Sequence, residues 1–93
     1  MAVQAYVLVD CGPGKPHQVA DALTKFAGVE TAHAVTGTYD VIAFVRVESM
    51  AELGDLLSRQ IHRLPGVVKT TTNLVVPGTA ASGSTGSNRG RRA

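Results

Sequence analysis

The stretch Val35-Thr36-Gly37-Thr38-Tyr39-Asp40 separates two runs of strand-forming residues. With Gly37 and Thr38 as its central pair, it predicts a type II′ β-hairpin, because glycine adopts the positive φ of that turn without steric cost. Thr36 then faces Tyr39 across the hairpin. This turn sets the register, and all other pairs of the two strands follow from it. A shift by one residue would move every side chain to the other face of the hairpin.

The predicted register assigns a character to each face of the hairpin. One face carries small apolar pairs, as expected of a surface beneath helices: Ala34 with Val41, and Ala32 with Ala43. The other face combines polar and bulky apolar groups: Val35 with Asp40, and His33 with Ile42. Such a mixture is unusual for a surface in water and suggests that a partner covers this face.

The rest of the chain predicts two helices and two further strands. We expect strands over Val3 to Asp10, Val29 to Thr36, Tyr39 to Val47 and Val67 to Val76. A first helix begins at Pro16 and runs to about Ala27, with the apolar stripe Val19, Ala20, Leu23, Phe26 and Ala27. A capping box, Ser49-x-x-Glu52, begins the second helix, and Pro65-Gly66 ends it. Its expected stripe is Met50, Leu53, Leu57, Ile61 and Leu64.

An internal repeat supports this order. Tyr6, Val7 and Val9 recur as Phe44, Val45 and Val47, and Gly28-Val29 recurs as Gly66-Val67. Two strand–helix–strand units with right-handed crossovers predict an α+β, ferredoxin-like βαββαβ fold, a four-stranded antiparallel sheet with both helices on one face. The other face would carry the apolar patch Tyr6, Leu8, His33, Ile42 and Phe44. We therefore expect a homodimer that forms through its sheets.

Composition limits the chain to one small domain with a tail. Of the 93 residues, 1–76 form the expected domain, and the Gly/Ser/Arg-rich segment 77–93 is expected to be disordered. The net charge of +2 includes three tail arginines, which leaves six Lys/Arg against seven Asp/Glu, or about −1, for the domain. We expect no direct DNA binding by the folded domain. A single cysteine and the lack of a signal peptide or membrane span predict a cytoplasmic protein.

Few residues suggest catalysis, a metal or a cofactor. Gly12-Pro13-Gly14-Lys15 lacks the spacing of a phosphate-binding loop. His17, His33 and His62 lack metal-ligand spacing, so we expect neither metal nor cofactor. Cys11 precedes a helix N-terminus that can lower a thiol pKa, yet without a neighbouring base it is expected to be a bystander.

A family resemblance emerges from motifs spread over the chain. The pattern runs from Gly28-Val29 through Val35-Thr36-Gly37-x-Tyr39-Asp40 to Leu64-Pro65-Gly66-Val67-x-x-Thr70-x-Thr72. It resembles the amino-acid-binding regulatory domain of the Lrp/AsnC (feast/famine) transcription regulators, over Met1 to Val76. The resemblance implies pairing through the sheets, assembly into higher even-numbered oligomers, and an amino-acid effector bound between dimers near Gly37 and Asp40. Family members usually carry a helix-turn-helix ahead of this domain, whereas here the first strand starts at Val3. We therefore expect a stand-alone version that acts on transcription through a partner regulator or its basic tail.

The chemistry of a free amino acid suggests roles for the hairpin residues. Amides around Gly37 can approach the carboxylate of the effector, and Asp40 can accept from its ammonium. Neighbouring residues that could complete the pocket are Thr36, Thr38 and Tyr39, with hydroxyls from Thr70 and Thr72, whose side of the sheet the sequence leaves open.

Two alternatives remain at this point. Dimeric α+β barrel enzymes that act on small molecules or haem share the predicted topology, but no cluster of titratable groups supports an enzyme here. A purely structural assembly domain would bind no small molecule.

Overall fold

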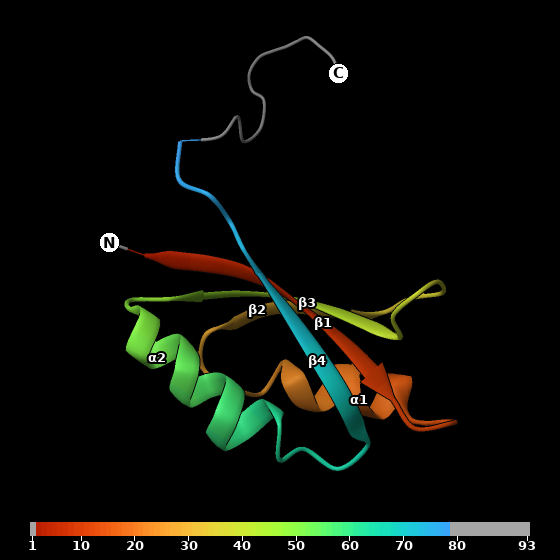
Figure 1. Ribbon diagram of the computed structural model, residues 1–93. Coiled ribbons are helices and arrows are strands. Elements are labelled where there is room, and N and C mark those ends of the chain that lie inside the picture. The colour runs from red at the N-terminus through yellow and green to blue at the C-terminus, as the bar shows by residue number, and fades with distance from the viewer. Residues whose placement is uncertain (1, 79–93) are drawn as a thin grey trace, which may run out of the picture.

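The computed structural model describes residues 2–78, so the predicted disorder of the tail concerns residues that are largely outside the described part. Along the chain the elements are β1 (Val3–Cys11), α1 (Pro16–Leu23), β2 (Val29–Ala34), β3 (Val41–Val47), α2 (Met50–Asp55), the π-helix η1 (Leu56–Ile61) and β4 (Val67–Leu74). The strands form one sheet in the order β2-β3-β1-β4, and neighbouring strands are antiparallel. Both helical segments lie on one side of it (Figure 1). The predicted ferredoxin-like fold is confirmed.

The hairpin register is also confirmed. Ala34 pairs with Val41, His33 with Ile42 and Ala32 with Ala43. The central strands continue this alternation, because Val7 pairs with Ala43 and Val9 with Val41.

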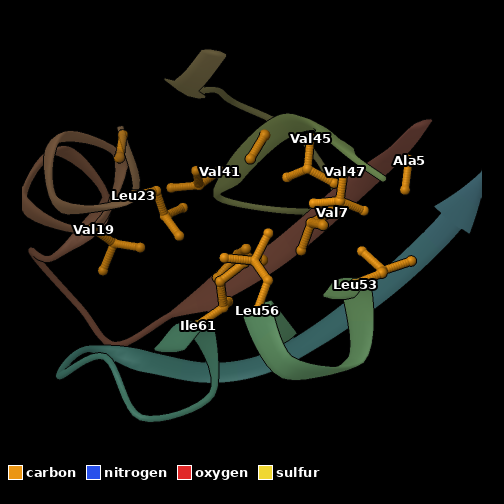
Figure 2. Packing of buried hydrophobic residues seen from close by; sticks show 13 residues of the cluster. Ala5, Val7, Val19, Leu23, Val41, Val45, Val47, Leu53, Leu56 and Ile61 are labelled. Atoms are coloured by element: carbon orange, nitrogen blue, oxygen red, sulfur yellow. The ribbon is translucent and has the colours of Figure 1, made fainter. Parts of the chain in front are cut away.

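The core lies between the sheet and the helices (Figure 2). It contains the fully buried strand residues Ala5, Val7, Val9, Val41, Ala43 and Val45. From the helices come Val19, Ala20, Leu23, Leu53, Leu56 and Ile61. Because side chains alternate between the two faces along each strand, the residues between these buried positions lie on the uncovered face of the sheet.

Two helix predictions need correction. The first helix ends at Leu23 rather than near Ala27; the chain then turns, with Phe26 N–H donating to Leu23 C=O, so Ala27 is not part of the buried core. In the second, Met50 is 56% exposed and Leu56, absent from the predicted stripe, is buried. Met50 lies in the first turn of α2, whereas Leu56 begins η1, in which His62 N–H donates to Leu57 C=O, five residues back. This wider turn brings Leu56 and Ile61 onto one face.

The capping box at α2 is present. Glu52 N–H donates to Ser49 Oγ (3.1 Å), and Glu52 Oε1 accepts from Glu48 N–H (3.0 Å). The glutamate thus reaches back one residue further than the usual box, and still satisfies a backbone donor ahead of the helix.

Candidate functional site

The hairpin tip is a wider loop than the sequence predicts. β2 ends at Ala34 and β3 begins at Val41, and Val35 N–H donates to Asp40 C=O (2.9 Å). Within residues 2–78 no hydrogen bond joins Thr36 to Tyr39. Gly37 has a positive φ of 144°, as predicted in sign, but a type II′ turn needs about 60°. The predicted two-residue turn is therefore wrong, because Asp40 is held by β1 instead.

Asp40 connects the hairpin to the end of β1. Its N–H donates to Val9 C=O (3.0 Å), and its carboxylate Oδ2 accepts from Cys11 N–H (2.8 Å). The register of β1 against β4 shifts between Asp10 and Cys11, beside this contact. In the described residues the second carboxylate oxygen, Oδ1, has no hydrogen-bond partner. Asp40 is thus a positioned acceptor with one oxygen still available.

Free backbone donors lie next to Asp40. Thr36, Gly37 and Thr38 are exposed, and within residues 2–78 their N–H groups donate to no other group. A Cβ built on Gly37 would have no atom within 4 Å, so this backbone is open to a ligand. Tyr39 is half-buried. Amide donors beside a carboxylate acceptor can bind a small molecule that carries both an anionic and a cationic group.

A shallow groove adjoins the loop. It has a volume of about 500 Å³ and is lined by Pro16, His17, Ala34, Val35 and Thr36. From the sequence we did not assign Pro16 or His17 to the effector site. The topology could have indicated them, since a right-handed crossover places the start of α1 near the sheet end where β1 finishes, beside the neighbouring hairpin.

Thr70 and Thr72 lie elsewhere. They pair with Val9 and Val7, whose side chains are fully buried on the helix side, so both hydroxyls are on that side of β4. Thr70 Oγ1 is hydrogen-bonded to Nε2 of His62 (2.7 Å). Because β1 and β3 separate β4 from β2, the two threonines and the tip of the loop are not brought together within one chain.

Cys11 is half-buried near two carboxylates. Burial raises the pKa of its thiol, and the charges of Asp40 and Asp10 raise it further. The lowering that a helix N-terminus can produce is therefore outweighed, and the thiol stays protonated at neutral pH. In the described part of the chain, no group of three or more His, Cys, Asp and Glu is placed to hold a metal ion. Nor do residues 2–78 contain a helix long and apolar enough to cross a membrane.

The face opposite the helices carries the predicted apolar patch. Tyr6 pairs with Phe44 and Leu8 with Ile42, while His33 lies beside Ile42. Tyr6 is 46% exposed, and its ring centroid is 5.0 Å from that of Phe44. These side chains form one continuous surface, which we call the open face.

Comparison with known proteins identifies the family. The profile of the Lrp/AsnC ligand binding domain matches residues 4–82. The HTH-type transcriptional regulator PH0140 of Pyrococcus horikoshii is 30% identical over 73 residues, which are 78% of this chain and 46% of the regulator. The chain therefore spans about half the length of the curated relatives it matches.

Solved structures agree with this assignment. The protein TTHA0845 from Thermus thermophilus is 29% identical with a TM-score of 0.79, over 85% of this chain and 99% of that one. The feast or famine regulatory protein Rv3291c from M. tuberculosis, complexed with L-methionine, is 26% identical with a TM-score of 0.70, over 86% of this chain and 54% of that one. The curated relatives are transcriptional regulators and the matched domain binds a ligand, so the enzyme alternative is not supported. The chain belongs to the Lrp/AsnC family, and residues 4–82 are its ligand-binding regulatory domain.

Proposed function

We propose that this domain binds a free amino acid at the hairpin loop and thereby contributes to the regulation of transcription. The observation that carries the proposal is the anchored Asp40 beside three free backbone amides. The L-methionine complex of the M. tuberculosis relative supports an amino acid as the class of effector.

The loop offers complementary groups for an amino acid. The carboxylate of the effector accepts from the N–H groups of Thr36, Gly37 and Thr38, which no side chain blocks at Gly37. Its ammonium donates to Asp40 Oδ1, while Oδ2 remains bound to Cys11 N–H. Tyr39 shapes the pocket beside them. Each of these hydrogen bonds involves a charged group and is stronger than a neutral one.

A neighbouring subunit completes this site. The loop encloses no ligand alone, and Thr70 and Thr72 lie at the other edge of the sheet. These threonines can therefore contribute only from another chain. Effector binding and assembly then favour each other by the same free energy.

Assembly through the open face is part of the proposal. Tyr6, Leu8, His33, Ile42 and Phe44 form a surface that a second sheet would bury, giving a homodimer and then higher even-numbered oligomers. The domain, with a charge near −1 from six Lys/Arg and seven Asp/Glu, does not itself bind DNA, so it acts with a DNA-binding regulator. A cytoplasmic location belongs to the same proposal and rests on the single cysteine.

Isothermal calorimetry with a panel of free amino acids, L-methionine included, tests the site. Asp40→Asn keeps an acceptor for Cys11 N–H but loses the charge, so we expect the affinity to fall roughly 10- to 100-fold, as for the loss of one hydrogen bond to a charged group. Asp10→Asn, a neighbouring acid outside the loop, is the matched control and should bind as wild type does.

Thermal unfolding should show that both variants remain folded. Undiminished affinity in Asp40→Asn would remove Asp40 from the site. Failure of every amino acid to bind the wild-type protein would reject the proposed effector class.

A further inference from the structure

Two threonines of β4, Thr70 and Thr72, lie on the helix side, and a histidine holds the hydroxyl of one of them. Thr70 Oγ1 is 2.7 Å from Nε2 of His62, within hydrogen-bond distance. In the part of the chain that the structure describes, Thr72 Oγ1 has no hydrogen-bond partner. A threonine hydroxyl can donate one hydrogen bond and accept two. Because the hydroxyl rotates to suit its partners, His62 determines which of these roles Thr70 keeps for another molecule.

The backbone at His62 is anchored, and its side chain remains accessible. His62 N–H donates to Leu57 C=O (2.8 Å) at the end of η1, and the preceding residue, Ile61, is fully buried. The side chain of His62 is exposed and that of Thr70 is half-buried, and both residues line a groove of about 270 Å³. A small molecule can therefore approach the Thr70 hydroxyl while this hydroxyl stays bonded to His62.

The proposed effector site, on which this inference rests, has few acceptors for its ligand. A free amino acid has a carboxylate with about four acceptor positions and an ammonium with three donors. In the proposed site the free backbone N–H groups of the loop face the carboxylate, whereas only Asp40 Oδ1 faces the ammonium. Since N–H groups cannot accept hydrogen bonds, the most useful contribution of a neighbouring chain is an acceptor for the ammonium.

We propose that His62 is a positioning residue that makes Thr70 an acceptor for the ammonium of the effector. In a neutral imidazole one ring nitrogen carries the proton and the other accepts. With the proton on Nδ1, His62 Nε2 accepts from the Thr70 hydroxyl, and both lone pairs of Oγ1 remain for the ammonium. The opposite tautomer would occupy one lone pair and turn the hydroxyl proton towards the ammonium. A hydroxyl that donates to a partner is also a stronger acceptor, because hydrogen bonds in a chain polarise one another.

The direction of this hydrogen bond can be measured without a ligand. Nitrogen NMR of the imidazole rings at about pH 8, where histidine is neutral, should show the proton of His62 on Nδ1. The spectrum of His62→Gln assigns the signals. In Thr70→Val, which removes the hydroxyl and keeps nearly the same shape, the proton should redistribute between the two ring nitrogens. A proton on Nε2 of His62 in the wild-type protein would overturn the proposed direction.

Calorimetry with the amino acid of the panel that wild type binds most tightly tests the effect on binding. The side chain of His62→Asn ends near the position of Nδ1 and cannot reach Thr70, so we expect the affinity to fall about 3- to 10-fold, as for one neutral hydrogen bond. His62→Gln is the matched control, because its amide lies near the position of Nε2 and can accept from Thr70. It should bind nearly as wild type does.

A double-mutant cycle connects the effect to Thr70. Thr70→Val should weaken binding about 10-fold or more, as for a hydrogen bond to a charged group. His62→Asn should then add no further loss, because it acts only through the missing hydroxyl. Thermal melts of the His62 variants should match wild type, since the side chain is exposed.

Three outcomes would overturn the positioning role of His62. These are unchanged affinity in His62→Asn, equal losses in His62→Asn and His62→Gln, and a full further loss from His62→Asn when Thr70 is already valine. Failure of the wild-type protein to bind any amino acid would instead reject the effector site, and this inference with it. The two failures are distinguishable, because wild type tests the site and the variants test only His62.

Discussion

Gly28 and Gly37 both have a positive φ, but alanine should destabilise the domain much more at Gly28. A Cβ at Gly28, where φ is 96°, would lie 2.9 Å from Val47 Cγ1 and 3.5 Å from Leu56 Cδ2. Val47 and Leu56 are both only 3% exposed, so neither side chain can move into solvent. At Gly37 the same Cβ would meet nothing within 4 Å.

The magnitudes follow from separate terms. A positive φ in a sparsely populated region costs alanine about 1–3 kcal/mol at either site. Alanine also restricts the unfolded chain more than glycine does, and this raises the free energy of unfolding by about 0.4–1 kcal/mol. Overpacking adds about 1–3 kcal/mol at Gly28 only. From these terms we expect Gly28→Ala to lower the free energy of unfolding by about 2–4 kcal/mol and Gly37→Ala by about 1 kcal/mol.

Urea unfolding followed by circular dichroism measures both values. For a domain of this size, each kcal/mol also corresponds to about 4–8 °C in the melting temperature. The double variant Gly28→Ala/Val47→Ala removes the contacting methyl group, so its destabilisation should be smaller than the sum of the two single effects by about 1 kcal/mol or more. Equal losses at Gly28 and Gly37, or strict additivity with Val47→Ala, would refute the steric reasoning.

Two other expectations concern the open face and the thiol. Phe44→Glu places an unpaired charge on the open face, which costs several kcal/mol in a sheet-to-sheet dimer. Light scattering should therefore find a folded species of lower mass than wild type, and an unchanged mass would contradict that interface. The raised pKa of Cys11 predicts slower alkylation by iodoacetamide at pH 8 than for free cysteine, with a partial recovery in Asp40→Asn, because a neighbouring negative charge is removed. Mass spectrometry over time would measure both rates, and a rate above that of free cysteine would show that the thiolate is stabilised instead.

Much of the fold was predictable from short-range patterns. The alternation around Gly37 predicted the pairs Ala34–Val41 and His33–Ile42, because each strand face has one chemical character. The box Ser49-x-x-Glu52 predicted the start of α2 for a similarly local reason. The π-helix escaped prediction, since the spacing of Leu53, Leu57 and Ile61 suits an ordinary helix equally well and only packing selects the wider turn.

The candidate site was predictable only in part. Gly37 and Asp40 attracted attention through their residue types, and the structure describes them as an open backbone and an anchored carboxylate. The anchor itself, Cys11 N–H, comes from a strand far away in the sequence. His17 was not assigned to the site, because it meets Thr36 through a groove that both residues line and not through a sequence motif.

The sequence by itself determined the order of the elements, the hairpin register, the apolar open face and the family resemblance, because neighbouring residues encode all of these through spacing and alternation. Only the tertiary structure decided that Asp40 binds the end of β1, that the loop at Gly37 is wide, and that Thr70 and Thr72 lie on the helix side of the opposite edge. These features depend on how distant strands align. The bulge at Val68 and the backbone donor at Cys11 belong to that alignment, and neither is marked by residue type.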